Sequence, residues 1–536
     1  MATGVVLYAA RVLTRSGWLA AVGAAALVII AAATRVGVGM SADSVTYIAE
    51  ARALREGRGV GVPAGIYSIY DDAPADEDIV AGPHFPPLFP AVLAAAGAWH
   101  DPRSSGRPVD AVLFVVSVLA LAVMIERYSG SRLVASLAAG MTALSAPVLE
   151  AYGMVWSEPL FIALGLIGLL ALSTYLERGR PWTLRAGALA MGLAWLTRYA
   201  GVAFVLTGLV VLVATGAARR RRQVVTFLGV SCLPTLGYLA AMRLAGRAGG
   251  GYTLDPHRPT AAVLRQGWES LREWVLPVGT PRVVPLLMWL PLAAAAVLLA
   301  RVARSRHNPS VPRLPHLPLV LAVFLLVYGT VLLASVAAFA ESVPLDTRML
   351  VPAYVAAVAL AACGVSRLRG RRLFVRAPVL GLVAAIAVGT VPGGWSQLHR
   401  GAPAYPSFTS SVWTSSALLR RTSALPTTAR VYSNFPDAVY LATGRGARLL
   451  PKYVLAGAKP NLDYAAQLAR VVDEVRHGDA VAVVFAAPGR GQVTDGPALA
   501  ARLGAPAAID GIVWEWGAAA TAALMPSGPS PTPRSP

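Results

Sequence analysis

Three charged side chains in this sequence could take part in chemistry because of where they lie. Asp43, in the segment Met40-Ser41-Ala42-Asp43-Ser44-Val45-Thr46-Tyr47, is a carboxylate just beyond the outer end of the first apolar run. Arg198 lies in the middle of the apolar run 184–216, and Arg348 directly precedes another run. An arginine inside an apolar run costs about 2.5–3.5 kcal/mol on insertion scales, so it is a functional candidate by default. Each has a structural alternative, because Asp43 could cap a helix and the arginines could reach the membrane interface.

Five short motifs occur in the order in which a known superfamily carries them. They are Asp43-x-x-x-Tyr47-x-x-x-Ala51-x-x-Leu54-x-x-Gly57, Pro83-His84-Phe85-Pro86-Pro87-Leu88-Phe89-Pro90, Trp156-Ser157-Glu158-Pro159-Leu160, Leu196-Thr197-Arg198-Tyr199-Ala200-Gly201, and Asp346-Thr347-Arg348-Met349-Leu350-Val351-Pro352. The arrangement resembles the GT-C superfamily of membrane glycosyltransferases, in particular the branch with protein O-mannosyltransferases and aminoarabinose transferases. Each motif is weak alone, and together they indicate the superfamily but not the substrate.

The resemblance implies a role for each matched residue. Asp43 would be the general base that deprotonates an acceptor hydroxyl in an inverting transfer. Arg198 and Arg348 would hold the phosphate of a polyprenyl-phosphate donor, since the arginine fork suits phosphate. Tyr47 and His84 would also contact substrate, although Phe85 stands where some relatives carry a lysine before Pro-Pro. Glu158 is as compatible with a structural hydrogen bond between helices as with a substrate role.

The composition excludes a soluble enzyme. The 536 residues are 56% hydrophobic and 14% charged, with a mean hydropathy of +0.58, whereas about a quarter of a soluble chain is charged. The net charge of +20 would suggest nucleic acid in a soluble protein. Here the arginines gather in short loops, at 219–222, 301–313 and 367–376, which is the positive-inside pattern of a membrane protein. Cys232 and Cys363 fall inside apolar runs, so neither a disulfide framework nor a thiolate metal site is expected.

The apolar runs predict a polytopic α-helical, GT-C-like membrane domain over residues 1–393, with 11 or 13 transmembrane helices and a cytoplasmic N-terminus. The predicted spans are 18–38, 86–100, 109–125, 132–150, 155–176, 184–216, 223–245, 283–300, 318–340, 349–365 and 377–393. The run 184–216 would be about 50 Å long as one helix. It is therefore either two short helices that meet near Arg198 or one steeply tilted helix.

Three segments are predicted to lie outside the membrane. The first outer loop, 40–85, carries an acidic patch at Asp71–Asp78, which is expected to be solvated although it could bind a divalent cation. Residues 259–276, with Trp268 and Trp274, fit a helix at the outer interface. Residues 394–524 are predicted to form an extracytoplasmic α/β domain before a disordered Pro/Ser-rich tail at 525–536. In it Arg430–Tyr432, followed by Pro436–Thr443, then Ala480–Phe485 and Ile512–Trp516, are predicted as strands alternating with helices such as Tyr464–Arg476.

The leading hypothesis is an extracytoplasmic glycosyltransferase that moves a sugar, such as mannose or arabinose, from a polyprenyl-phosphate carrier to a hydroxyl of a lipid, glycan or protein. Membrane lipids are further expected partners, and nucleic acid, a resident metal and any other cofactor are not expected. A transporter or flippase of lipid-linked sugars is the first alternative, but it predicts internal repeats and paired broken helices that the sequence lacks. The second is a non-catalytic membrane protein that binds cell-envelope glycans. Phosphate loops, zinc-protease motifs and serine-hydrolase motifs are absent from the sequence.

Overall fold

The structure is a computed structural model. It describes residues 2–70, 79–81, 85–98, 102–216, 221–244, 254, 256–275, 315–339, 344–368, 373–404, 407–410, 413, 416–426, 429–455, 459–486, 492–510 and 513–517. The chain divides into two compact units. We call Met1–Gly39 with Phe85–Tyr405 the membrane unit, and Met40–His84 with Pro406–Pro536 the α/β unit.

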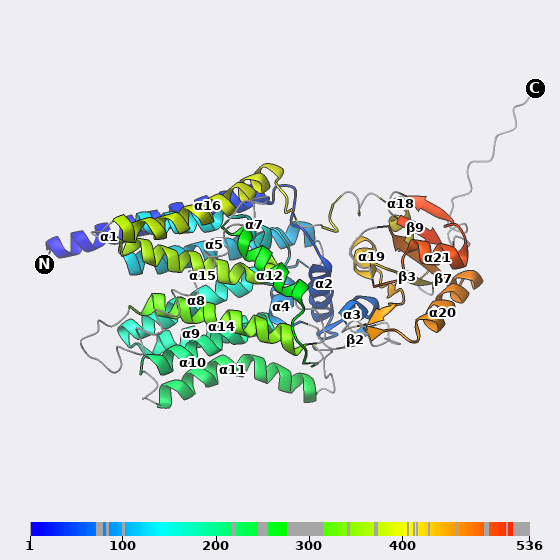
Figure 1. Ribbon diagram of the computed structural model, residues 1–536, viewed down its shortest axis with the longest axis horizontal. Coiled ribbons are helices and arrows are strands. Elements are labelled where there is room, and N and C mark those ends of the chain that lie inside the picture. Colours follow the sequence, from blue (N-terminus) through cyan, green and yellow to red (C-terminus); the bar gives the residue numbers. More distant parts are fainter. Residues whose placement is uncertain are drawn as a thin grey trace, which may run out of the picture. The chain divides into compact units, whose positions relative to one another are not determined.

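The membrane unit is built from helices that run roughly parallel to one another (Figure 1). In chain order the helices are α1 (Ala2–Ala33), α4 (Leu88–Ala95), α5 (Pro102–Ser129), α6 (Arg132–Ala143), α7 (Ala146–Tyr152), α8 (Glu158–Arg178), α9 (Pro181–Thr197), η1 (Tyr199–Gly201), α10 (Val202–Ala214), α11 (Arg221–Leu244), α12 (Ala261–Glu273), α14 (His316–Ala338), α15 (Thr347–Ser366) and α16 (Leu373–Arg400). Among the described residues, seven helices are long and apolar enough to cross a membrane, or eight if the bent pair α6–α7 forms one span. The predicted class, a polytopic helical membrane protein with a small C-terminal sheet region, is confirmed.

The described helices correspond to the predicted spans, with the following exceptions. The predicted span 86–100 is wrong, because α4 has only eight residues and reaches about 12 Å. The run 132–150 is bent by 64° between α6 and α7. The span 283–300 lies outside the described residues, so the total of 11 or 13 stays a prediction. Helix α16 continues to Arg400, beyond the predicted end at 393.

Glycines allow the helices around Arg198 to approach one another closely. A Cβ atom on Gly192 of α9 would lie 2.3 Å from the carbonyl oxygen of Ser231 on α11, and one on Gly168 of α8 would lie 2.7 Å from Met191 of α9. Small residues at such contacts let helix backbones pack together where lipid offers no hydrophobic driving force. Beside them, the rings of Phe204 and Phe324 stack with centroids 4.6 Å apart. This packing fixes the ends of α8 and α9, which carry the candidate residues.

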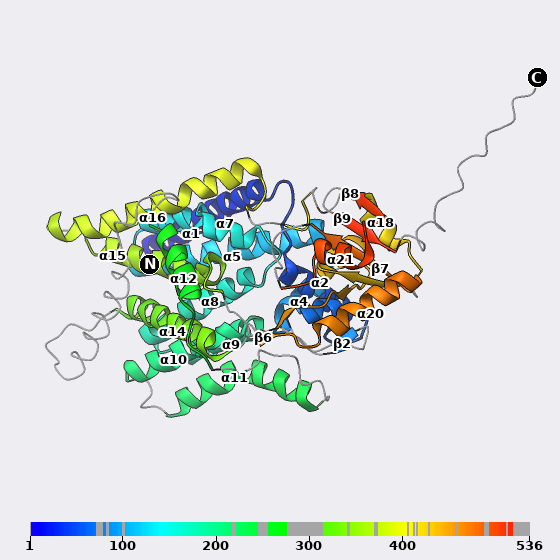
Figure 2. The ribbon, with the colours of Figure 1, turned by 45° about the vertical axis from the view of Figure 1, so that its right-hand side comes forward.

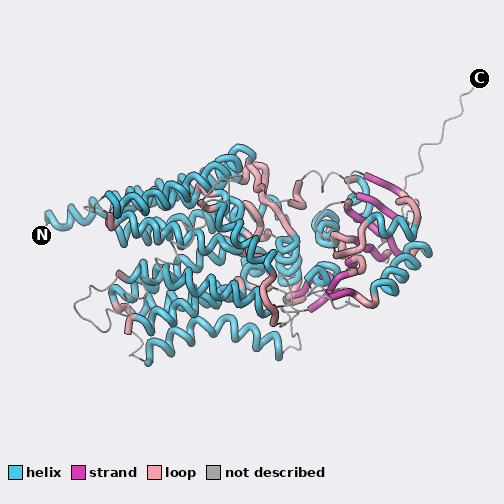
Figure 3. The backbone as a smooth tube through the Cα atoms, in the orientation of Figure 1, coloured by secondary structure: helices cyan, strands magenta, loops and turns pink. Residues whose placement is uncertain are grey.

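The α/β unit contains a five-stranded sheet, whose strands are drawn in magenta in Figure 3. The sheet strands are β3 (Arg430–Ser433), β4 (Arg448–Leu449), β7 (Ala480–Phe485), β8 (Ala508–Asp510) and β9 (Val513–Trp516), in the order β4-β3-β7-β9-β8. Strand β3 pairs in parallel with β4 and β7, whereas β9 is antiparallel to β7 and β8. A two-stranded sheet is formed by β5 (Val454–Leu455) and β6 (Lys459–Pro460).

Helices cover both faces of the larger sheet. Successive residues of β7 point to opposite faces, so β7 contributes to a core on each side. Val481, Val483 and Phe485 pack in one core with α18 (Ala417–Ser423) and α19 (Pro436–Thr443). The alternate residues of β7 pack in a second core with α20 (Tyr464–His477) and α21 (Gly496–Leu503), which Figure 2 shows beside β7. The predicted strand 480–485 is observed with the predicted bounds, and the strands predicted at 430–432 and 512–516 are observed at 430–433 and 513–516. The segment 436–443 is a helix instead, begun by Pro436 and ended by Gly444 with φ +72°.

The first loop folds with the C-terminal segment. It forms α2 (Ala42–Arg55), β1 (Gly61–Pro63), α3 (Ala64–Tyr70) and β2 (Ile79–Ala81), with β1 and β2 antiparallel. Val45 and Ala49 of α2 pack with Val62, Ile66 and Tyr440 in one apolar cluster. This buried cluster joins the first loop to α19, which explains why residues 40–84 group with the α/β unit.

Candidate functional site

Glu158 is the centre of the candidate site in the membrane unit. It is the first residue of α8 and is 1% exposed. Its Oε1 atom lies 2.8 Å from Nη1 of Arg198 and also pairs with Nε of Arg348, while Nη2 of Arg348 donates to Oε2 at 3.5 Å. One buried carboxylate therefore holds two guanidinium groups that are far apart in the sequence. We call these three residues the Glu158 cluster.

Each arginine of the cluster has further anchors. Arg198 donates through Nη1 to the Ser157 hydroxyl at 2.8 Å and through Nη2 to the Met349 sulfur at 3.1 Å. The Arg348 guanidinium lies 4.2 Å from the centre of the Trp156 ring, which is a cation–π contact. These contacts fix the direction of both guanidinium groups and reduce the entropy that binding an anion would cost.

The backbone near Arg198 explains how an arginine sits within an apolar run. Helix α9 ends at Thr197, Arg198 is extended with φ −148° and ψ 140°, and a short 3₁₀ turn leads into α10. A Cβ atom on Gly201 would lie 2.4 Å from the Trp195 Cα atom, so the turn requires glycine there. Of the two alternatives for residues 184–216, two helices meeting near Arg198 is therefore confirmed.

The position of Arg348 follows from the start of α15. Asp346 caps this helix, because its Oδ1 atom accepts a hydrogen bond from the Met349 amide at 2.9 Å. The hydroxyl of Tyr328 on α14 donates to the Met349 carbonyl oxygen at 2.7 Å. The first turn of α15 is thereby tied to α14, and Arg348 is held beside Glu158.

The cluster has a formal charge of one positive unit, with the cations at its surface. The side chains of Arg198 and Arg348 are 15% and 17% exposed, against 2% for Glu158. An approaching anion would therefore meet guanidinium groups before the carboxylate. Removing water from such a site strengthens the attraction between an arginine and a phosphate or carboxylate.

A cavity of about 340 Å³ lies beside the cluster. Arg348 and Trp156 line it, and four carboxylates face it from α7, from α12 and from the start of α15: Glu150, Glu269, Glu273 and Asp346. Helix α12 corresponds to the helix predicted over 259–276, and its neighbour Trp274 packs on Tyr354 of α15 with centroids 5.3 Å apart. Carboxylates accept hydrogen bonds from hydroxyl groups, so the cavity could hold a polyhydroxylated group.

In the α/β unit, Asp43 lies in the first turn of α2, but Ser41 is the N-cap residue. The Ser41 amide donates to the Ser44 hydroxyl at 3.0 Å, which closes the helix start without Asp43. A carboxylate in the first turn is favoured by the helix dipole. Tyr47 follows one turn later and is 1% exposed. The capping role considered for Asp43 in the sequence thus belongs to Ser41.

Glu50 is a carboxylate that the sequence reasoning missed. It is fully buried on α2, and neither oxygen has a hydrogen-bond partner within the described part of the chain. Burial raises the pKa of Glu50 well above its usual value. The spacing 43, 47, 50 places Asp43, Tyr47 and Glu50 on one helix face, and this spacing could have been used to find it.

Two of the predicted features cannot be located. His84 and the acidic patch Asp71–Asp78 lie outside the described residues. Among the residues that are described, no group of three or more histidines, cysteines and carboxylates could hold a metal ion.

Comparison with known proteins bears on the class of this chain. Residues 84–236 match the family model described as dolichyl-phosphate-mannose-protein mannosyltransferase. The matched segment contains Glu158 and Arg198 and ends within α11. No sequence relative was found among curated proteins.

Solved structures with a similar chain course include two of ArnT from Cupriavidus metallidurans, in the apo state and bound to undecaprenyl phosphate. Both are 17% identical over 94% of this chain and 98% of the other, with TM-scores of 0.47 and 0.45. The Archaeoglobus fulgidus oligosaccharyltransferase in complex with zinc and sulfate is 13% identical over 87% of this chain and 68% of the other, with a TM-score of 0.46.

The family match confirms the resemblance drawn from the motifs. The apolar helices show a multi-pass membrane protein, and residues 84–236 are similar to the mannosyltransferase family.

Proposed function

We propose that the chain transfers a sugar from a polyprenyl-phosphate donor to a hydroxyl of a lipid, glycan or protein, with inversion at the anomeric carbon. The observation that carries the proposal is the Glu158–Arg198 pair at 2.8 Å, which lies inside the segment matching the mannosyltransferase family. A solved ArnT structure contains undecaprenyl phosphate, which supports a lipid phosphate as the donor's leaving group.

Asp43 acts as the general base in this proposal. It takes the proton from the acceptor hydroxyl, whose oxygen forms the new bond to the anomeric carbon. The bond between that carbon and the phosphate oxygen breaks, and the electron pair stays on the lipid phosphate. The fixed guanidinium groups of Arg198 and Arg348 stabilise the charge that develops there. A proton transfer from Asp43 to solvent regenerates the base and completes the cycle.

Tyr47 and Glu158 contribute by position rather than by proton transfer. Glu158 orients both arginines through its two oxygens. Tyr47 lies one turn from Asp43 on the same helix face, and its buried ring holds in place the helix that carries Asp43. His84, predicted from its Pro-Pro motif, is assigned to the donor phosphate or to the acceptor.

Transfer takes place on the extracytoplasmic side in this proposal, with the N-terminus in the cytoplasm and residues 394–524 outside. The arginine-rich loops at 219–222, 301–313 and 367–376 support this orientation. In intact cells a membrane-impermeant maleimide should label Ser423→Cys, an exposed position of α18. Labelling only after cell lysis would reverse the assigned orientation; the wild-type chain, with Cys232 and Cys363, gives the background.

The experiment for the catalytic proposal is transfer by the full chain in proteoliposomes that contain polyprenyl-phosphate mannose or arabinose. Asp43→Asn should lower the rate by about 100-fold or more, as expected when a general base is lost, while donor binding persists. Asp473→Asn, on an exposed face of α20, is the matched control and should keep wild-type activity. Full activity of Asp43→Asn would remove Asp43 as the base.

A further inference from the structure

A second group of arginines lines a large pocket contained entirely within the α/β unit. The pocket has a volume of about 740 Å³ and lies between α2, β1 and α3 on one side and β3, α19 and β4 on the other. Such a volume is typical of a site for a small molecule or a short chain segment rather than a single ion. The charged residues that line it are Arg52, Glu56, Arg58, Arg430, Arg445 and Arg448.

The pocket carries a strong excess of positive charge. Five arginines face one lining carboxylate, Glu56, which already pairs with Arg58. Outside the lining, Glu474 pairs with Arg430 at 2.9 Å between Oε1 and Nη1. Counting both carboxylates leaves a formal excess of three positive charges. Clefts with one sign of charge concentrate ligands of the opposite sign.

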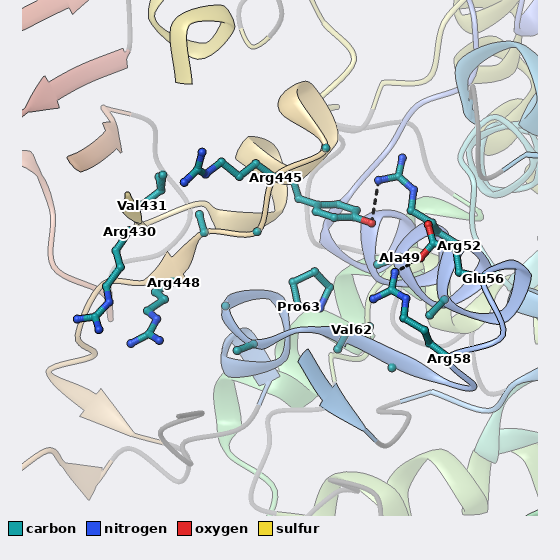
Figure 4. Close-up of a pocket in the computed structure, with 18 of the residues that line it drawn as sticks. Ala49, Arg52, Glu56, Arg58, Val62, Pro63, Arg430, Val431, Arg445 and Arg448 are labelled. Atoms are coloured by element: carbon teal, nitrogen blue, oxygen red, sulfur yellow. Dashed lines mark hydrogen bonds and ion pairs between the residues drawn. The ribbon is translucent and has the colours of Figure 1, made fainter. Parts of the chain in front are cut away.

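The arginines are held in place by separate partners. Arg52 donates to the Tyr440 hydroxyl at 3.2 Å, and its guanidinium lies 5.3 Å from the centre of that ring. Arg445 donates to the carbonyl oxygens of Leu425 and Pro426 at 2.7 Å each and also to that of Ala429, so the backbone engages its guanidinium and it contributes charge rather than a fork. Figure 4 shows Arg430 and Arg448 beside each other, with Pro63 between them and a group formed by Arg52 of α2 and by Glu56 and Arg58, which follow that helix. The positive groups are therefore spread over the pocket rather than gathered at one point.

The two walls of the pocket pack closely against each other. A Cβ atom on Gly65 would lie 1.7 Å from the carbonyl oxygen of Ala447, so α3 touches the segment before β4. Beside the arginines, the Tyr440 ring and the backbone of Gly444 and Gly446 also line the pocket. An aromatic ring and exposed peptide groups next to spread cations suit a ligand that is extended, partly apolar and carries several anionic groups.

We propose that this arginine pocket, defined by Arg52, Arg58, Arg430, Arg445 and Arg448, binds an anionic saccharide segment with carboxylate or phosphate groups. Several anions along one chain would meet positive charges on both walls. The preference for anions follows from the arginines. That the ligand is a saccharide, as the acceptor or a part of it, rests on the proposed glycosyltransferase function.

The test is a binding measurement on the full chain in detergent, without donor. The probe is fluorescent pentagalacturonate, and neutral maltopentaose of equal length is the uncharged comparison. The double variant Arg52→Gln/Arg448→Gln should weaken pentagalacturonate binding by about 10-fold or more, since hydrogen bonds to charged groups are lost. Arg470→Gln, which removes an exposed arginine of α20 outside the pocket, should bind like wild type.

A second variant guards against misfolding. Arg448→Lys keeps the positive charge. It should therefore retain most of the affinity for pentagalacturonate if the double variant loses affinity because positive charge is removed and not because the chain misfolds. An unchanged affinity of the double variant, or equal binding of maltopentaose, would overturn the proposal. Farnesyl phosphate should not compete; competition that disappears in the double variant would assign the pocket to the lipid donor and also overturn it.

This result is independent of the catalytic proposal. Weaker binding in the double variant together with full activity of Asp43→Asn overturns the catalytic proposal alone, whereas unchanged binding together with transfer that requires Asp43 overturns the pocket proposal alone.

Discussion

The Glu158 cluster and the arginine pocket use the same cation in two different ways. In the cluster, two arginines share one buried carboxylate, and contacts with Ser157 and Trp156 fix them further. In the pocket, five arginines are spread around about 740 Å³. The first arrangement suits one phosphate at a defined point, and the second suits an extended anion. In both proposals, the spacing and anchoring of the arginines, and not their number, distinguish the kind of anion.

The largest effect is expected from breaking the cluster at Glu158. Removing one partner of a buried ion pair costs about 3–5 kcal/mol, because the other charge stays buried and unpaired. Glu158→Gln should lower the thermal unfolding temperature of the detergent-solubilised chain and abolish use of the lipid donor. Glu177→Gln is the control on the same helix, since Glu177 is 40% exposed and pairs with Arg127 at 3.2 Å. Equal unfolding temperatures for the two variants would mean that the cluster contributes little to stability.

Lysine substitutions separate geometry from charge. Arg348→Lys keeps a cation but loses the fork and the stacking on Trp156, so donor use should fall by about 10- to 100-fold. Arg448→Lys in the pocket should change pentagalacturonate binding by only about 2- to 3-fold, since charge dominates there. The measurements are the KM for polyprenyl-phosphate sugar and the Kd for pentagalacturonate. Equal fold-losses of donor use in Arg348→Lys and of pentagalacturonate binding in Arg448→Lys would show that the two groups of arginines do not differ in their need for the guanidinium geometry.

Glu50 offers a smaller test, as a buried carboxylate for which no partner is found in the described residues. Its pKa is raised by burial, so the folded chain keeps its proton at a pH where the unfolded chain, with a pKa of about 4.3, has released it. The contribution of protonated Glu50 to stability is therefore complete below the unfolded pKa. It decreases as the pH rises above that value, and it is lost once the pH passes the folded pKa.

The measurement for Glu50 is the unfolding temperature between pH 4 and pH 8. Glu50→Gln cannot ionise, so it should lose less stability than wild type over this range. Glu177→Gln should follow the wild-type profile, because it leaves Glu50 unchanged. A Glu50→Gln profile identical to that of wild type would show that Glu50 titrates like an exposed glutamate.

The sequence predicts local features of this molecule better than its sites. The apolar run 184–216 is longer than one upright span, so a break near Arg198 is one of its two predicted arrangements. Six consecutive apolar residues predict β7. The segment Pro436–Thr443 was assigned wrongly although Pro436 and Gly444 mark a helix start and end. The meeting of Glu158 with Arg198 and Arg348 depends on how three helices pack, and the arginine pocket joins residues near 52 and 448. Neither of these juxtapositions has a signal in local sequence.

The central claim is that a lipid phosphate is held by the Glu158 cluster while Asp43 faces the acceptor. The most direct measurement is an experimental structure of the full chain with polyprenyl phosphate bound. Phosphate oxygens are expected within hydrogen-bonding distance of the Arg198 and Arg348 guanidinium groups. A phosphate bound elsewhere, with both arginines still engaged only by Glu158, would contradict it.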